Sequence, residues 1–125
     1  MPMQTQARDV VERYYAAFDA HSQDWTDLIT DDVVFDGPIQ HARGKAEFVA
    51  LTQQFLHAHR GTRLLGRVAN SDEVASLLEF TIDAPSGEQL TCTVAEWAMI
   101  VDGRVKEFRV YYDPRAFVRA FGMGD

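Results

Sequence analysis

The spacing of apolar residues changes at Gly61, from intervals typical of helices to the alternation typical of strands. Before Gly61, apolar side chains recur every three or four residues over 6–21 and 45–59, which predicts two amphipathic helices. A shorter helix and a short strand at 33–35 are predicted between them, and Gly61 is a natural helix stop. The first half of the chain is therefore expected to be mainly helical.

After Gly61, polar and apolar residues alternate, and this period of two predicts four strands. The strands are expected at 63–70, 74–84, 89–101 and 104–112, and a short helix is expected at 115–121. The turn between the last two strands is Asp102-Gly103, a dipeptide that suits a two-residue hairpin turn with positive φ. A turn centred on Ser86-Gly87 joins the preceding pair, so the strands form an antiparallel meander.

The two turns set the strand register and, with it, the faces of the sheet. The last turn places Trp97 opposite Phe108. The earlier turn places Phe80 opposite Thr93 on the same, nearly uncharged face. Side chains of this face, of the helices and of the first strand are expected to line a pocket for an apolar small molecule: Phe18, Phe35, Phe55, Phe80, Thr93, Trp97, Phe108, Val110 and Tyr112.

The order of the elements, with helices first and an antiparallel meander last, is typical of the α+β class. We expect a curved antiparallel sheet, made of the four-strand meander and a short first strand, wrapped around three N-terminal helices. A curved sheet covered by amphipathic helices commonly leaves a cavity between the two layers. A chain of 125 residues is expected to form one domain, spanning 1–125, with a single core.

Charge and cysteine content narrow the classes of partner and compartment. The net charge of -7 argues against nucleic acid or an anionic membrane as the main partner, because both favour a basic face. The single cysteine, Cys92, rules out an internal disulfide and suits a reducing compartment. No secretory signal is visible, and no apolar run approaches the ~20 residues needed to cross a bilayer. The expected location is the cytoplasm.

Several short motifs spread over the whole chain carry a family resemblance: Arg13-Tyr14 with Ala16-Ala17, the run 31–38, Arg43-Gly44-Lys45, and the closing segments 102–105 and 111–113. Through these motifs the chain resembles the nuclear transport factor 2-like superfamily, and particularly its SnoaL-like and ketosteroid isomerase-like members. The resemblance implies a cystatin-like α+β cone with an internal pocket. This fold hosts isomerases, cyclases, dehydratases, epoxide hydrolases, transport factors and plain binding modules.

The resemblance transfers to catalytic positions only in part. Tyr14 matches the first-helix tyrosine that the family's isomerases use as an oxyanion donor. Gly37 stands where those isomerases carry their aspartate base, and Asp36 precedes it by one residue. Thr93 aligns with their second, protonated aspartic acid, and Val110 with the last-strand aspartate of the family's epoxide hydrolases. Both known catalytic sets are therefore incomplete here.

Tyr14, Asp36 and His41 are the candidate catalytic residues. Tyr14 would polarise a substrate carbonyl, and Asp36 or His41 would move the proton. A structural role stays open for each: helix packing for Tyr14, a turn carboxylate for Asp36, and a solvated loop side chain for His41. No group of residues has metal-ligand spacing and no glycine-rich phosphate loop is present, so neither a metal nor another cofactor is expected.

The favoured function is that of a small-molecule-binding SnoaL-like protein, an isomerase- or cyclase-type enzyme that transfers protons on an apolar, carbonyl-bearing substrate. The alternatives are a non-catalytic module that holds a hydrophobic ligand, and a dimeric interaction protein with the same fold. The missing acids at Gly37, Thr93 and Val110 favour the binding module over a standard isomerase.

The outer face of the predicted sheet is expected to form a homodimer. On this face the predicted register sets Glu96 opposite Arg109, beside Tyr111. An exposed ion pair contributes only about 0–1 kcal/mol, so the mixed apolar and charged surface around the pair is the stronger indication.

Overall fold

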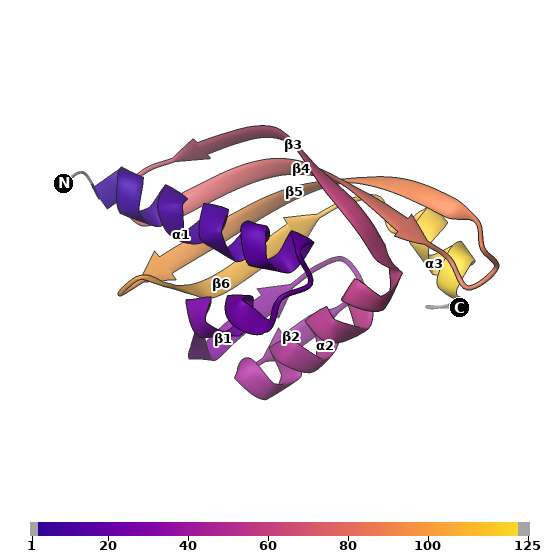
Figure 1. Ribbon diagram of the computed structural model, residues 1–125, viewed down its shortest axis with the longest axis horizontal. Helices are drawn as coiled ribbons and strands as arrows, with labels where there is room; N and C mark the ends of the chain where they lie inside the picture. The colour runs from indigo at the N-terminus through magenta and orange to yellow at the C-terminus, as the bar shows by residue number, and fades with distance from the viewer. Residues whose placement is uncertain (1–2, 123–125) are drawn as a thin grey trace.

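The computed structural model describes residues 3–122 (Figure 1). Most of its helices lie in the first half of the chain, and its four long strands follow one another in the second half. Their bounds are Met3–Asp19 (α1), Gln23–Leu28 (η1, a 3-10 helix), Ile29–Asp36 (β1), His41–Arg43 (β2), Lys45–Ala58 (α2), His59–Ala69 (β3), Glu73–Asp83 (β4), Gln89–Val101 (β5), Arg104–Tyr111 (β6) and Arg115–Phe121 (α3). Helical segments dominate before β3 and strands dominate after it, as the change of period at Gly61 predicts.

The strands form one six-stranded sheet in the order β2-β1-β6-β5-β4-β3. All neighbours are antiparallel except β1 and β6, which run parallel. The α+β class with a curved, unclosed sheet is confirmed. Two details differ from the prediction: β2 forms in a segment expected to be a loop, and β1 joins the sheet through a parallel pairing.

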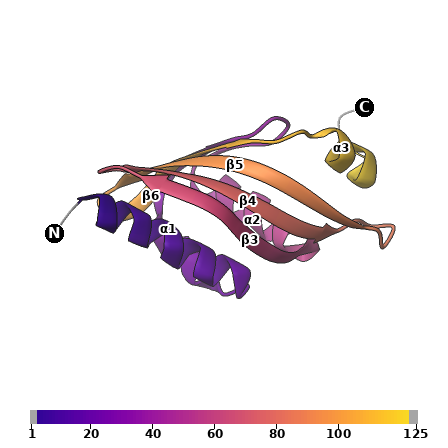
Figure 2. The same cartoon turned by 90° about the horizontal axis from the view of Figure 1, so that it is seen from above.

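Helices α1 and α2 lie on the same side of the curved sheet, which Figure 2 shows from above. The core between the layers contains Trp25, Phe48 and Phe108 as its largest fully buried side chains. Phe48 of α2 stacks on Phe108 of β6, with ring centroids 5.3 Å apart and planes at 4°. Burying a side chain of this size stabilises the fold by roughly 1.5–3 kcal/mol. Among residues 3–122, no helix is long and apolar enough to span a membrane.

The junction between α2 and β3 lies earlier than the glycine signal predicts. α2 ends at Ala58, and His59 already pairs with Ile82 of β4. His59 is fully buried, and its ring packs edge-on against that of Phe18, with ring centroids 4.9 Å apart. Sheet pairing and this packing outweigh the helix-stop preference of Gly61, which lies inside the strand.

The hairpin between β5 and β6 begins as predicted and then changes register. Asp102 and Gly103 have φ values of 52° and 77°, as the two-residue turn requires. Ile100 pairs with Val105 as expected, but Met99 pairs with Glu107. A β-bulge therefore leaves Lys106 as an extra residue of β6, and every pair beyond it is shifted by one position.

The hairpin between β4 and β5 is shifted by one residue as well. Its loop has five residues, 84–88, so Asp83 pairs with Gln89 and Phe80 pairs with Cys92 instead of Thr93. Because β5 is shifted relative to both neighbours, its two faces are exchanged while those of β4 and β6 are as predicted. Glu96 consequently faces the core, and the predictions that Trp97 and Thr93 face the core are wrong.

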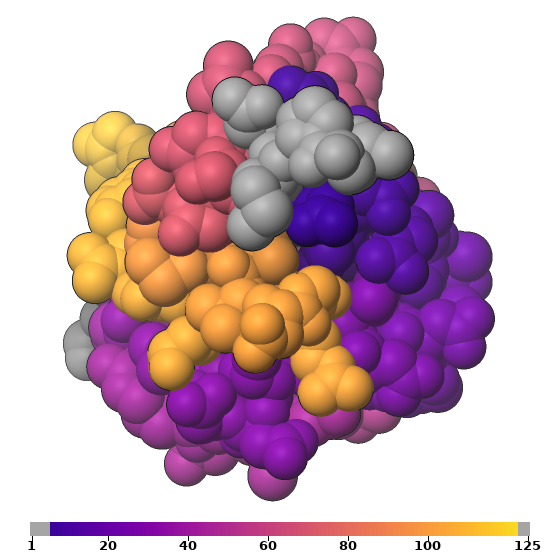
Figure 3. Space-filling view, turned by 90° about the vertical axis from the view of Figure 1, so that its left-hand side faces the viewer, coloured from indigo at the N-terminus to yellow at the C-terminus, as the bar shows by residue number. Residues whose placement is uncertain are grey.

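The turn of the β3–β4 hairpin and the turn of the β5–β6 hairpin meet at one end of the molecule. The backbone N–H of Ile100 donates to the carbonyl of Asp72 at 2.8 Å, which ties the β5 end to the β3–β4 turn. Figure 3 looks onto this end, where the β5–β6 turn (orange) and the β3–β4 turn lie beside α1 (indigo). The opposite end of the sheet carries α3, which follows β6 directly (Figure 1).

Candidate active site

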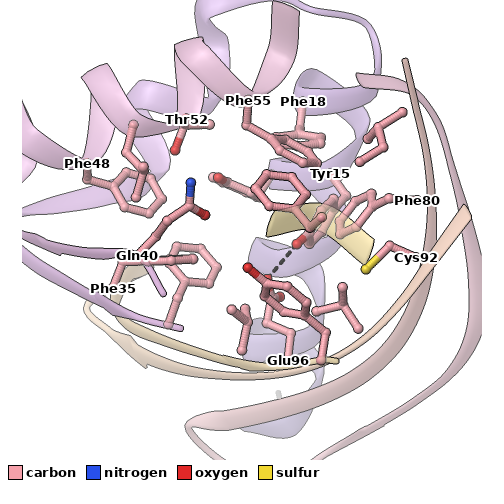
Figure 4. A pocket seen from close by; sticks show the side chains of 18 residues that line it. Tyr15, Phe18, Phe35, Gln40, Phe48, Thr52, Phe55, Phe80, Cys92 and Glu96 are labelled. Carbon is pink, nitrogen blue, oxygen red and sulfur yellow. Dashed lines mark hydrogen bonds between the residues drawn. The ribbon is translucent and has the colours of Figure 1, made fainter. Parts of the chain in front are cut away.

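A cavity of about 110 Å³ lies between the helices and the inner face of the sheet (Figure 4). Eight of the residues predicted to reach a pocket do line it: Tyr14, Phe18, Phe35, Phe55, Phe80, Phe108, Val110 and Tyr112. Seven of the eight are aromatic, and several of their rings are in contact: the ring centroids of Tyr14 and Phe108 are 5.2 Å apart, and those of the stacked Phe18 and Phe55 are 6.1 Å apart. The lining is mostly apolar, so the few polar groups in it define where chemistry can occur.

Glu96 of β5 is the carboxyl group of this cavity. Its side chain points inward, and the residue is only 6% exposed. The Tyr15 hydroxyl donates a hydrogen bond to Glu96 Oε2 at 2.5 Å, whereas Oε1 has no hydrogen-bond partner among the described residues. A buried acceptor without a partner is uncommon, and here it lies beside an empty volume. The free oxygen is therefore available to a ligand.

Burial raises the pKa of Glu96 to about 7, because a charged carboxylate is poorly solvated in the apolar cavity. The hydrogen bond from Tyr15 and the positive charge of Arg67 both oppose this rise. Near neutral pH, comparable fractions of Glu96 are ionised and protonated. Such a group can accept a proton in one step and return it in the next.

Arg67 is held close to Glu96 by the register of three strands. Arg67 of β3 pairs with Ser76 of β4, and Ser76 pairs with Glu96 of β5. The Arg67 side chain is only 5% exposed, and its Nε donates to Ser76 Oγ at 2.8 Å. The three residues thus form a row across the sheet that fixes a positive charge at one side of the carboxyl group.

Tyr14 is the second polar group that reaches the cavity. Burial, and then the negative charge of Glu96, raise the pKa of Tyr14 well above its ordinary value, while Thr52 acts in the opposite direction. The phenol therefore stays protonated and can donate a hydrogen bond. In Figure 4 the side chains of Thr52 and Gln40 point toward the same part of the cavity, away from Cys92.

Asp36 and His41 are not brought to this cavity. His41 begins the edge strand β2 and Asp36 ends its neighbour β1; His41 Nδ1 is 2.9 Å and Arg43 Nη1 is 3.1 Å from Asp36 Oδ1. The hydrogen bond with His41, and then Arg43, lower the pKa of Asp36. Strand alternation explains the placement, because Phe35 faces inward and its neighbour Asp36 therefore faces out.

Gly37, where related isomerases carry their base, packs closely against Val110. A Cβ atom added there would lie 3.0 Å from Val110 Cγ2, so a side chain at this position would require Val110 to shift. The carboxyl group that lines the cavity comes from β5 and not from the end of β1.

No metal site is seen in the described part of the chain. Within residues 3–122, no group of three or more His, Cys, Asp or Glu side chains is placed to hold a metal ion. His21 and His59 do approach each other, with ring nitrogens 3.1 Å apart, but they lie outside the cavity lining.

A model of the SnoaL-like domain family matches residues 11–108 of the chain. The chain belongs to the SnoaL-like family. A search of curated proteins found no match. The matched range includes Tyr14, Tyr15 and Glu96, and it ends before the last residues of β6 and before α3.

Solved structures share the fold of this SnoaL-like protein at low sequence identity. A SnoaL-like protein from Jannaschia sp. CCS1, provisionally named a polyketide cyclase, is 18% identical with a TM-score of 0.83, over 100% of this chain and 97% of its own. A Bacillus subtilis protein provisionally named an isomerase is 18% identical with a TM-score of 0.83, over 99% and 98%. Bal32a, from a soil-derived mobile gene cassette, is 19% identical with a TM-score of 0.85, over 95% and 98%. At these identities the likeness concerns the fold.

Of the residues predicted to line the pocket, Thr93 and Trp97 do not line this cavity. Trp97 lies on the outer face, where the Arg109 guanidinium is 5.7 Å from its ring centroid. The sequence reasoning missed Glu96 and its partner Tyr15, having assigned Glu96 to the outer face. A signal was present: counted from 90 to 100, the even positions of β5 are apolar apart from one carboxylate, Glu96. A lone acid within an inward-facing apolar row is typical of a functional group.

Proposed function

We propose that this SnoaL-like protein is a cofactor-free enzyme that transfers a proton between two positions of a small, apolar, carbonyl-bearing molecule. The observation that carries the proposal is the unpartnered Oε1 of Glu96, a buried carboxyl group beside the apolar cavity. Glu96 is the base, and Tyr14 is the hydrogen-bond donor to the substrate oxygen. Asp36 and His41, which lie at the sheet edge, take no part.

In the first step, ionised Glu96 removes a proton from the carbon next to the carbonyl, and the electron pair moves onto the carbonyl oxygen. The neutral Tyr14 hydroxyl donates to this oxygen as negative charge develops on it, a contribution worth several kcal/mol in a dry site. In the second step, protonated Glu96 returns the proton to a different carbon, or the carbanion attacks a second carbonyl of the same molecule, whose π electrons move to its oxygen, and that oxygen takes the proton from Glu96. The first outcome is an isomerisation and the second is a ring closure, and neither needs an external reactant.

The test uses a one-ring ketone with β,γ unsaturation, a cyclohexenone, whose conjugated isomer absorbs more strongly in the ultraviolet. The protein is expected to accelerate the isomerisation, and Glu96→Gln to reduce the rate by about 100-fold or more. Tyr14→Phe should lower kcat without abolishing binding. Equal rates for the wild type and Glu96→Gln would refute the role of Glu96.

The second candidate is a non-catalytic module that holds an apolar ligand in the same cavity, and the aromatic lining favours it. A wild type that binds cyclohexanone, seen as shifts of cavity resonances in NMR spectra, but neither isomerises the enone nor exchanges the α-protons of the ketone with deuterium would establish the binding module instead.

We also propose that the outer face of the sheet binds a second copy of the chain. Leu77, Val68 and Tyr111 are 43%, 68% and 59% exposed, and Leu77 and Tyr111 flank Trp97 in one shallow surface hollow. The Glu96 side chain, which was expected on this face, is buried and lines the cavity instead. Light scattering after size exclusion should give twice the chain mass of 14.1 kDa, and Leu77→Glu should halve it. A wild-type mass of one chain would exclude the dimer.

A further inference from the structure

The cavity is separated from a second hollow by a thin wall at the end of the sheet that carries α3. The second hollow is a groove of about 420 Å³ between β5 and α3. Ile82, Cys92 and Phe117 line both spaces. Ile82 and Cys92 belong to the sheet, so Phe117 is the only one of the three on a helix that follows the last strand.

The cavity by itself is small. Its volume of about 110 Å³ is of the order of the engineered apolar cavity of about 150 Å³ that binds benzene, whereas typical ligand pockets hold about 300–1,000 Å³. A single ring therefore suits the space next to Glu96. A molecule of two or more fused rings exceeds this space, and the groove behind Phe117 adjoins it.

Phe117 packs against the core and against two other aromatic rings. Its ring contacts that of Tyr112 edge-on, with centroids 6.3 Å apart, and stacks on that of Phe121, with centroids 4.6 Å apart. None of the residues of α3 is fully buried. α3 is seven residues long and follows Pro114, and Arg115 pairs with Asp113 beside that proline. The helix also lies beyond the residues that the family model matches.

We propose that Phe117 sets the upper size limit of the ligand, so that the protein accepts one-ring carbonyl compounds and excludes fused-ring ones. The inference rests on the proposed function, in that it takes the cavity beside Glu96 as the ligand site. Phe117 is a specificity residue and not a catalytic one. Its ring closes the cavity on the groove side, and its removal joins the two spaces.

The experiment compares the binding of cyclohexanone and of α-tetralone, a fused two-ring ketone, to the full chain. NMR titration follows the Glu96 carboxyl carbon, which reports occupation of the inner cavity. The wild type is expected to bind cyclohexanone at least about tenfold more tightly than α-tetralone, a difference of one decade in Kd. Phe117→Ala should remove that preference, and Phe117→Leu should reduce it. Phe121→Ala is the matched control, since Phe121 stacks on Phe117 but lines neither space, and it should keep the preference.

The outcomes distinguish failure of the size limit from failure of the proposed ligand site. A wild type that binds both ketones equally well would overturn the size limit and leave the ligand site intact. A preference that survives in folded Phe117→Ala would overturn it too. If neither ketone perturbs the Glu96 signal in the wild type or in Phe117→Ala, the cavity is not a ligand site, and the proposed function fails together with the size limit.

Discussion

Two carboxyl groups, Glu96 and Asp36, lie in the same sheet but in opposite surroundings. Glu96 is 6% exposed, and burial raises its pKa to about 7. The Asp36 side chain is 33% exposed, and the hydrogen bond with His41, followed by Arg43, lowers its pKa. A carboxylate that accepts hydrogen bonds beside a guanidinium is a weak base, whereas one that loses solvation is a stronger base. The comparison indicates that burial, more than position next to a family motif, raises the basicity of a carboxyl group in this protein.

The largest difference is expected in catalysis. Glu96→Gln keeps the shape of the side chain and removes the base, so kcat/KM for the β,γ-unsaturated ketone should fall by about 10²–10⁴-fold. Asp36→Asn changes a group at the sheet edge and should leave kcat/KM within about twofold, as expected of a residue outside the reaction. Steady-state absorbance assays on the two variants decide the matter. A large loss in Asp36→Asn would make the edge carboxylate the functional one.

The second difference is in the dependence of stability on pH. The pKa of Glu96 is raised from 4.5 in the unfolded chain to about 7 in the folded protein, so the folded state binds the proton more tightly. The stability gained is present below the unfolded value and is lost as the pH rises toward 7, by on the order of 3 kcal/mol. Urea unfolding between pH 5 and pH 8 should show this decline in the wild type and a much flatter profile in Glu96→Gln.

Asp36 should act in the opposite direction, which provides the control. Its pKa is lowered in the folded protein, so its contribution is lost as the pH falls in the acid range. Asp36→Asn should therefore flatten the acid limb of the profile and leave the neutral limb unchanged. A neutral limb that is the same in the wild type and Glu96→Gln would mean that Glu96 titrates at its ordinary pKa.

The hydrogen bonds to the two groups should have smaller effects. Tyr15→Phe removes the donor to Glu96 Oε2 and should raise the pKa of Glu96 further, by about one pH unit, the value of a hydrogen bond to a charged acceptor. His41→Ala should raise the pKa of Asp36 toward its ordinary value. Carbon NMR titration of the carboxyl signals, assigned with Glu96→Gln and Asp36→Asn, measures both. A lower pKa of Glu96 in Tyr15→Phe would contradict the assigned hydrogen bond.

The smallest effects are expected from the charges that lie near each group. Arg67→Met should raise the pKa of Glu96 by less than Tyr15→Phe does, while Arg67→Lys, which keeps the charge, should leave it nearly unchanged. Arg43→Met should raise the pKa of Asp36. The same titrations apply. Equal shifts in Arg67→Met and Arg67→Lys would show that Arg67 acts through packing and not through its charge.

Much of the fold could be predicted from the sequence, because long elements repeat their signal many times. The two turns assigned one common face to β4, β5 and β6, and alternation within β4 and within β6 keeps Phe80 and Phe108 on the inward face as predicted. The inward face of β5 depended on the register at both turns. A five-residue loop and one bulge, neither of which alternation can reveal, were enough to exchange Glu96 and Trp97.

The candidate site was predictable only in part. The family resemblance pointed to Tyr14, and most of the aromatic lining followed from the inward faces predicted for the other elements. The carboxyl group of the cavity was not predicted, because a sequence shows the charge of Glu96 but not its burial. The pKa of Glu96 depends on that burial, since it determines how well the carboxylate is solvated. The row from Arg67 to Glu96 depends on pairings across three strands, which no local pattern contains.

The bulge in β6 also makes the length of that strand part of the cavity's chemistry. Lys106 is the extra residue that lets Val105 and Phe108, three positions apart, both point into the core. Deleting Lys106 would leave Val105 and Phe108 two positions apart, so regular alternation would keep both in the core and only the bulge would be lost. One residue inserted between Lys106 and Glu107 would instead turn the rest of the strand over, bringing Glu107 and Arg109 to the places of Phe108 and Val110. A one-residue insertion would therefore convert an apolar wall into a charged one, and it is expected to be far less tolerated than deletion or substitution of Lys106.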